Sequence, residues 1–249
     1  MPKQGEIDYL DNLDAESVAH AAAKPWSDPG CGQYLVEIGT ILSLLPPPPA
    51  RLLDLGCGTG WTSRMFAQRG YDVVGQDIAP SMIELARAAP PSTGRVDFVV
   101  SDYETLPYEG TFDIAVFYDA LHHAVDEAEA LAGAARALRP GGLLVTVEPG
   151  VGHARAEHSR RAVDDFGVTE KDMPPRHIAA VGARLGLELV AVHIDPALLQ
   201  RAGYGDAGPS RLRWTSRVLR RRPARAALLA ASALYRPRTG RGIVVLRKS

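Results

Sequence analysis

Short apolar runs alternate with amphipathic segments through the middle of the chain. Five runs have the length and composition of buried strands, at residues 51–55, 71–76, 96–100, 112–117 and 142–148. Segments with apolar residues three or four apart, as in helices, lie among them at residues 61–69, 80–88 and 126–138. Strands and helices that alternate in this way predict a parallel sheet with helices on both faces.

The segments on either side of this core are less regular. Residues 1–29 are polar and irregular apart from a short Ala-rich helix expected at 15–23, and a longer helix is expected at 33–45, ended by the prolines of 46–49. After residue 148 we expect a loop rich in His and Arg, and a lid at 166–175. A helix at about 175–185 and strands at 187–194 and 242–247 complete the pattern. One α/β domain with seven strands, mostly parallel, is therefore predicted.

The strongest chemical signal is the segment from Leu52 to Gly60. It predicts a buried strand that carries Asp54 and then turns on three glycines spaced two apart, Gly56, Gly58 and Gly60. Such a turn presents bare backbone to a nucleotide-like ligand at the carboxyl end of the first strand. Asp77 ends the next apolar strand, and a carboxylate about 20 residues beyond the turn is placed to accept hydrogen bonds from ribose hydroxyls.

The spacing of the glycines argues against a dinucleotide. The third glycine of a dinucleotide-binding turn is replaced by Trp61, which would crowd a pyrophosphate. Asp54 is a poor neighbour for phosphate and a good partner for an amine. A ligand with a ribose, no phosphate and a cationic amino-acid end fits better, and S-adenosylmethionine is such a ligand. A nicotinamide-dependent oxidoreductase remains the less favoured alternative.

Five blocks in register extend this pattern over residues 51–148. They are residues 54–60, 74–82, 99–107, 112–123 and 137–148. Together they resemble the motifs of class I S-adenosylmethionine-dependent methyltransferases. The resemblance implies a Rossmann-like α/β fold, S-adenosylmethionine as cofactor and methyl transfer as activity. It also implies three regions in one domain, namely an N-terminal helical segment (1–49), a cofactor-binding core (50–148) and a substrate-side region (149–249).

The same resemblance assigns roles around the cofactor. Gly56, Gly58 and Gly60, with Cys57 between them, would approach its methionine portion, and Asp54 would hold the ammonium directly or through water. Asp77 would take the ribose hydroxyls. Four further residues complete the set: Ile78 on the adenine face, Asp102 at the adenine amino group, Tyr103 beside it, and Tyr118 where the methyl group meets the acceptor. Solvated strand-end carboxylates and ordinary packing remain the alternative explanations.

Three histidines are candidate catalytic residues. His122 and His123 follow the fourth strand, and His153 follows the fifth strand, which ends at Glu148. An imidazole there would accept a proton during methyl transfer, and Glu148 or His153 would contact the acceptor. Structural capping and a solvated loop are the alternatives, since positioning alone accelerates such reactions. Adjacent histidines are expected to point in different directions and no zinc spacing is present, so no metal site is predicted.

The net charge of −1 conceals an uneven distribution. Residues 201–249 hold 13 basic residues and one acidic residue, Asp206. They include most of an insertion at about 196–241, expected to form a helical cap over or beside the substrate mouth. Its Arg-rich part, 211–222, is compatible with peripheral contact with an anionic membrane, or with ion pairs to the acidic remainder of the chain. Nucleic acid is unlikely as a partner, because no RNA-binding module accompanies this segment.

These observations favour a methyltransferase acting on a small molecule or a glycan, at oxygen rather than nitrogen or carbon. Residues 61–63 and 148–153 look similar to bacterial methyltransferases associated with surface polysaccharide assembly. A non-catalytic cofactor-binding regulatory module is the main alternative. No apolar run approaches the ~18 residues of a membrane span, the N-terminus lacks a signal-peptide pattern, and two cysteines exclude a disulfide scaffold. A cytoplasmic protein is expected, with membrane association through the Arg-rich part as an alternative to be considered beside it.

Overall fold

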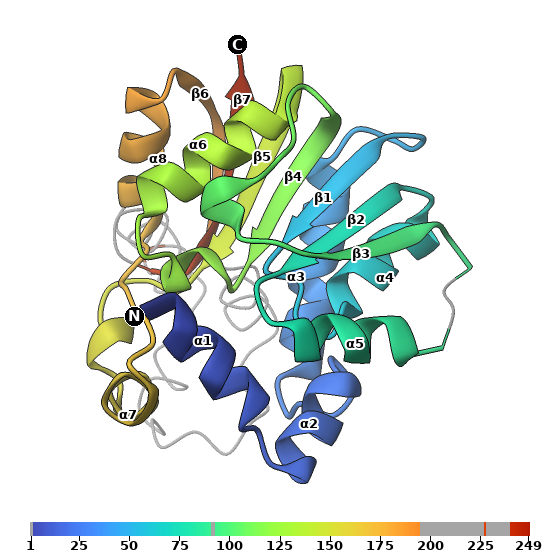
Figure 1. Cartoon of the computed structure of the whole chain (residues 1–249). Coiled ribbons are helices and arrows are strands. Elements are labelled where there is room, and N and C mark those ends of the chain that lie inside the picture. The colour runs from blue at the N-terminus through green and yellow to red at the C-terminus, as the bar shows by residue number, and fades with distance from the viewer. Residues whose placement is uncertain (1, 91–92, 195–226, 228–239) are drawn as a thin grey trace.

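A seven-stranded sheet forms the centre of the protein (Figure 1). The structure is a computed structural model that describes residues 2–90, 93–194, 227 and 240–249. The strand order is β3-β2-β1-β4-β5-β7-β6. The strands are β1 (Arg51–Leu55), β2 (Asp72–Asp77), β3 (Val96–Val100), β4 (Phe112–Tyr118), β5 (Leu138–Glu148), β6 (Leu187–Ile194) and β7 (Gly242–Lys248). Neighbours are parallel except β7, which is antiparallel to both β5 and β6.

Helices cover both faces of the sheet and one edge. The helices of the described residues are α1 (Pro2–Asp11), α2 (Ala15–Ala22), α3 (Cys31–Leu44), α4 (Trp61–Arg69), α5 (Pro80–Ala88), α6 (Glu127–Ala137), α7 (Glu157–Phe166) and α8 (Pro175–Arg184). Short 3₁₀ turns are η1 (Tyr103–Thr105), η2 (Leu121–His123) and η3 (His153–Arg155). In Figure 1, α6 and α8 lie in front of the sheet, and α3 and α4 lie behind it.

Successive side chains along a strand point to opposite faces of the sheet, and they build one apolar core on each face. Leu52 belongs to the core under α3 and α4, while Leu53 belongs to the core under α6 and α8. Ile114 and Ala115 divide in the same way on β4. All four side chains are fully buried. A strand with both faces covered is apolar at most positions, which is why the nearly continuous apolar runs identified these strands correctly.

Most predicted elements are confirmed, and two helices were missed. The first 29 residues are not irregular, because α1 precedes α2. The expected loop after residue 148 contains η3 and all of α7. Neither helix buries a large apolar side chain among its described residues: α7 buries only Ser159. The two helices instead meet each other, with the rings of Tyr9 and Phe166 5.1 Å apart in an edge-on arrangement.

The predicted cap cannot be compared with the structure. Within the insertion, only Ala227, Gly240 and Arg241 belong to the described residues, and the Arg-rich part 211–222 lies outside them. No helix in the described ranges is long and apolar enough to span a bilayer.

The carboxyl ends of the parallel strands form the edge at which loops from β1, β2, β4 and β5 converge. In Figure 1, α1 lies across this edge between α7 and α5. A Cβ atom on Gly5 would lie 2.4 Å from the carbonyl oxygen of Phe166, so α1 packs closely on the end of α7. Ligands bind at this edge in open α/β sheets, and α1 therefore adds a wall to the expected site.

Candidate functional site

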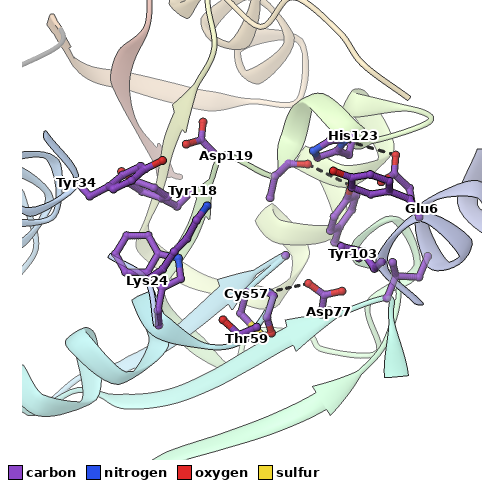
Figure 2. A pocket seen from close by; sticks show the side chains of 17 residues that line it. Glu6, Lys24, Tyr34, Cys57, Thr59, Asp77, Tyr103, Tyr118, Asp119 and His123 are labelled. Carbon is purple, nitrogen blue, oxygen red and sulfur yellow. Dashed lines mark hydrogen bonds and ion pairs between the residues drawn. The ribbon is translucent and has the colours of Figure 1, made fainter. Parts of the chain in front are cut away.

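A cavity of about 260 Å³ lies at this edge of the sheet (Figure 2). That volume is just below the range typical of small-molecule sites, about 300–1,000 Å³. Its lining comes from α1, the N-terminal helical segment, the glycine turn, the ends of β2 and β4, η1 and η2. The predicted site residues among its lining are Gly56, Cys57, Gly58, Asp77, Ile78, Tyr103, Tyr118 and His123.

The glycine turn presents backbone to this cavity at Gly58. Its φ is +52°, and a Cβ atom built there would have nothing within 4 Å, so the chain is open to a ligand at this point. Gly60 is different, because its Cβ atom would lie 2.5 Å from the ring of Phe98. Gly60 does not line the cavity, and it allows close packing of the turn on β3.

Asp77 is buried at the cavity wall. Its Oδ2 accepts the Gly58 N–H at 2.8 Å, and its Oδ1 accepts the Ala79 N–H at 3.0 Å. Burial raises the pKa of Asp77, and these hydrogen bonds oppose the rise. A carboxylate has about four lone-pair positions, so acceptor capacity remains for hydroxyl groups of a ligand. The ribose role of Asp77 stays a prediction that this placement suits.

Asp54 lies beneath the turn and does not line the cavity. Its Oδ2 accepts hydrogen bonds from the hydroxyls of Thr62 and Ser63, both at 2.6 Å. The side chain is almost fully buried, and burial raises its pKa to about 6. Asp54 thus joins β1 to the start of α4, and the predicted contact with an ammonium group remains untested.

Asp102 is also outside the cavity lining. It accepts the Glu104 N–H at 2.9 Å and forms an ion pair with Lys3 of α1. The same lysine lies 2.9 Å from Glu104. The Asp102 carboxylate, which the resemblance assigns to the adenine amino group, is therefore already paired with Lys3. Tyr103, one residue on, does line the cavity, and its hydroxyl donates to the Ala120 carbonyl at 3.3 Å.

Three aromatic rings form one end of the cavity. Trp61 meets Tyr118 at 5.4 Å and Tyr34 at 5.7 Å between ring centroids, both edge-on. The Lys24 ammonium lies 5.6 Å from the Tyr34 ring centroid. Burial raises the pKa of Tyr34 to about 12, so this phenol is neutral at physiological pH. The end of the cavity is therefore apolar, with one ammonium group at its rim.

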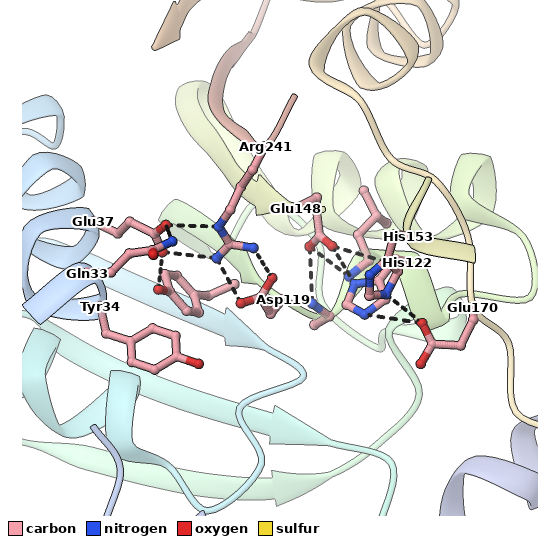
Figure 3. A network of polar contacts seen from close by, with 12 residues as sticks. Gln33, Tyr34, Glu37, Asp119, His122, Glu148, His153, Glu170 and Arg241 are labelled. Carbon is pink, nitrogen blue, oxygen red and sulfur yellow. Dashed lines mark hydrogen bonds and ion pairs between the residues drawn. The ribbon is translucent and has the colours of Figure 1, made fainter. Parts of the chain in front are cut away.

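Beside the rings lies a buried ion-pair network (Figure 3). Arg241 donates to Glu37 at 2.9 and 3.0 Å and to Asp119 at 2.8 Å. The Tyr118 hydroxyl also donates to Glu37. Burial favours neutral Asp119, but Arg241 outweighs it and lowers the pKa of that carboxyl. Arg241, counted in the sequence as part of the basic insertion, is in fact a partly buried partner of two carboxylates, of which Glu37 is fully buried.

The two adjacent histidines lie together, and the expectation that they point apart is wrong. Their ring centroids are 4.0 Å apart, tilted by 40°, because both sit on the tight turn η2. Only His123 lines the cavity. His122 is buried behind it, with Nδ1 2.7 Å from Glu148 Oε2.

Glu148 does not line the cavity and offers no group to an acceptor there. It is fully buried and accepts the backbone N–H groups of Ala120 and Leu121 at 3.1 and 2.9 Å. It therefore fixes η2 onto the end of β5. His153 is likewise outside the cavity lining, with Nε2 2.6 Å from Glu170, and burial lowers its pKa.

The groups around His123 favour its protonated form. Burial opposes protonation, but the hydrogen bond and charge of Glu6, with Glu170 and the Thr169 carbonyl, raise the pKa of His123 to about 9. An imidazolium at neutral pH cannot accept a proton. The arrangement therefore favours a role for His123 in holding α1 over a role as a general base.

Sequence reasoning missed the N-terminal half of the cavity wall. Glu6, Tyr9 and Leu10 come from α1, Lys24 follows α2, and Tyr34 lies on α3. No motif marks these residues, because only the packing of the N-terminal helices over the sheet edge brings them to the site. Asp119, at the end of β4, completes the wall.

Comparison with known proteins agrees with the geometry. Residues 53–146 match a family model described as a methyltransferase domain. An uncharacterised methyltransferase of Mycobacterium tuberculosis is 41% identical over 101 residues, 41% of this chain and 40% of that protein. A ubiquinone biosynthesis O-methyltransferase of Xanthomonas axonopodis pv. citri is 35% identical over 112 residues, 44% of this chain and 47% of that protein. The chain thus spans less than half the length of these curated relatives.

The fold comparison extends over more of the chain. The crystal structure of an S-adenosylmethionine-dependent methyltransferase from Mesorhizobium loti has a TM-score of 0.58 and 25% identity, covering 85% of this chain and 97% of that one. Together with the family match, it identifies the fold as that of class I methyltransferases, whose cofactor is S-adenosylmethionine.

Proposed function

Starting from a class I methyltransferase domain over residues 53–146, we propose that this protein transfers a methyl group from S-adenosylmethionine to a hydroxyl of a small molecule or saccharide. The observation that carries the proposal is the meeting of Gly58 and Asp77 in one cavity wall. There, open backbone lies beside a carboxylate with unused lone pairs.

The lining has a complementary group for each part of this cofactor. Asp77 suits the ribose hydroxyls, and Ile78 and Tyr103 offer apolar surface to adenine. Lys24 supplies the only ammonium among the described residues that line the cavity, and it suits the methionine carboxylate. The bound cofactor would supply an electrophilic methyl group on a sulfonium.

The residues around the methyl position would act mainly by orientation. Trp61 and Tyr118 exclude water from the apolar end, and Asp119 would accept a hydrogen bond from an acceptor hydroxyl. Its pKa is low because of Arg241, so it is a weak base. Orientation of the acceptor oxygen in line with the methyl group would then supply most of the acceleration. The named activity of the Xanthomonas relative supports oxygen as the acceptor atom.

Two measurements on purified protein test this proposal. Calorimetry with S-adenosylmethionine measures cofactor binding, and transfer of a labelled methyl group to metabolite and glycan fractions measures catalysis. Asp77→Ala should weaken cofactor binding by about 10-fold or more, because charge-assisted hydrogen bonds are lost. Asp72→Ala, at the opposite end of the same strand with only solvent-exposed ion pairs, is the matched control.

The alternatives give different results in the same measurements. Cofactor binding without transfer to any fraction would favour a non-catalytic regulatory module. Tight binding of NADH in place of S-adenosylmethionine would favour an oxidoreductase. Unchanged cofactor affinity in Asp77→Ala would remove the ribose assignment.

A further inference from the structure

Helix α1 closes one side of the cavity (Figure 1). It lies across the sheet edge between α7 and α5, and Glu6, Tyr9 and Leu10 line the cavity. The enclosed volume of about 260 Å³ is below the range of about 300–1,000 Å³ that is typical of small-molecule sites. Methyl transfer brings two molecules together, the cofactor and the acceptor. With α1 in this position the cavity is too small for both, so we expect α1 to move when they bind.

The apolar packing that holds α1 is slight. Its larger apolar side chains, Ile7, Tyr9 and Leu10, are only partly buried. The Tyr9 ring meets that of Phe166, which is itself 36% exposed. A segment with few buried apolar contacts opens at a lower free energy than the core does. The short segment 12–14, which joins α1 to α2, offers a hinge for such an opening.

Charged side chains hold α1 at two points instead. The first is near the start of the helix, where Lys3 forms ion pairs with Asp102 and, at 2.9 Å, with Glu104. Asp102 directly precedes Tyr103, which lines the cavity. The Lys3 side chain is partly exposed, so water and salt weaken this contact.

The second point is Glu6, one turn along the helix (Figure 2). Its Oε1 accepts the Thr169 N–H at 3.0 Å and lies 3.4 Å from His123 Nδ1. His123 Nδ1 also donates to the Thr169 carbonyl at 3.0 Å, and the groups around this ring favour the imidazolium. Glu6 therefore joins α1 to η2 and to the segment between α7 and α8 by a contact that is partly ionic.

We propose that α1 is a gate over the cofactor site, which these two ionic contacts hold closed in the free protein. For S-adenosylmethionine to enter and S-adenosylhomocysteine to leave, α1 swings on the segment 12–14 and both contacts break. Ion pairs that water reaches contribute little to stability, so the open state stays accessible. Cofactor entry then depends on the fraction of molecules that are open. This gate rests on the cofactor and is independent of the acceptor.

Stopped-flow binding of S-adenosylhomocysteine to the full chain tests the gate. Trp61 lines the cavity, so tryptophan fluorescence follows binding. The observed rate in the wild type should level off as ligand concentration rises, because opening becomes limiting. The double variant Lys3→Met with Glu6→Gln should raise that limiting rate by about 10-fold, since two partly exposed ionic contacts are lost. High salt should speed entry in the wild type and leave the double variant unchanged.

A matched control lies on the same helix. Gln4→Ala removes an exposed hydrogen bond, from Gln4 Nε2 to Asp8 Oδ1 at 2.9 Å, that stays within α1. This variant should bind the ligand at the wild-type rate. Thermal melting would establish that every variant is folded.

Hydrogen exchange without any ligand is the second measurement. Amides of α1 should exchange faster than those of α6, which buries Leu131 and four further residues. The double variant should speed exchange in α1 by about 10-fold and leave α6 unchanged. The gate is overturned if either the limiting rate of entry or the exchange of α1 is the same in the double variant as in the wild type. If no S-adenosylhomocysteine binds, the cofactor assignment fails, and hydrogen exchange still decides whether α1 opens.

Discussion

The two sides of the cavity are built in different ways. The first, here called the glycine wall, consists of residues 56–58 with Asp77 and Ile78. The second, here called the assembled wall, consists of Glu6, Lys24, Tyr34, residues 118–119 and His123. The glycine wall comes from two adjacent strands less than 25 residues apart in the chain. The assembled wall draws on three N-terminal helical segments and the end of β4.

Their polar groups are satisfied by different interactions. In the glycine wall, Gly56 and Cys57 donate backbone N–H groups to the Gln76 carbonyl at 2.8 and 2.9 Å, and Asp77 accepts from Gly58. In the assembled wall, side chains form ion pairs with residues far away in the sequence, such as Asp119 with Arg241 and His123 with Glu6. Removal of one side chain should therefore destabilise the assembled wall more than the glycine wall.

The largest effect is expected from Arg241→Met. It leaves the fully buried Glu37 carboxylate with Tyr118 and Gln33 but without its cation. Removing one member of a buried ion pair costs about 3–5 kcal/mol. Denaturant unfolding should show a loss of that size.

A control for this loss lies on β7, the strand that follows Arg241. Arg247→Met removes an exposed arginine 3.5 Å from Glu188, and exposed pairs contribute about 0–1 kcal/mol. Equal effects of the two substitutions would contradict the contrast between the walls. If the double variant Arg241→Met with Glu37→Gln recovers part of the lost unfolding free energy, the loss comes from the unpaired Glu37 carboxylate.

The second largest effect is the pH dependence of stability caused by Asp54, which lies beneath the glycine wall. The pKa of Asp54 is about 6 in the folded protein, against about 3.9 in an unfolded chain. The folded state thus binds more protons between these values. The contribution of Asp54 to stability is fully present below pH 4 and is lost as pH rises through about 6, by a few kcal/mol in total.

Asp54→Asn isolates this effect from those of other carboxyls. The difference in unfolding free energy between wild type and variant, measured from pH 4 to pH 7, should change in favour of the variant as pH rises. A difference that stays constant across this range would show that Asp54 titrates normally, and that burial beneath the turn is incomplete.

The smallest effect is expected from Lys24→Met. If Lys24 faces the methionine carboxylate, its loss should weaken S-adenosylmethionine binding by about 5-fold, roughly 1 kcal/mol, because the ammonium is partly exposed. High salt should reduce the difference, since screening weakens the wild-type contact. Lys171→Met, which alters an ion pair with Glu127 on α6, is the control. Equal cofactor affinities in all three proteins would exclude Lys24 from the cofactor site.

The core of the fold was predictable because it depends on local pattern. The bounds of β1, β3, α4 and α5 agree with the structure to the residue. Apolar residues predominate in both strands, and these helices have buried residues three or four apart, such as Met82 and Ala86. In contrast, α1 and α7 bury no large apolar side chain among their described residues and pack on each other, so only the folded chain reveals them.

The sequence by itself determined the glycine wall. Gly56 and Gly58 follow the end of β1, and Asp77 ends the adjacent parallel strand β2. Leu55 lies opposite Gln76, so the proximity of these residues follows from strand order. Only the tertiary structure decided the assembled wall and the contacts of His153 with His122. Glu6 meets His123 and Thr169, and Arg241 meets Glu37, across 117 to 204 positions of the chain. Such contacts depend on how helices dock over the sheet edge, and no periodicity or spacing in the sequence encodes that docking.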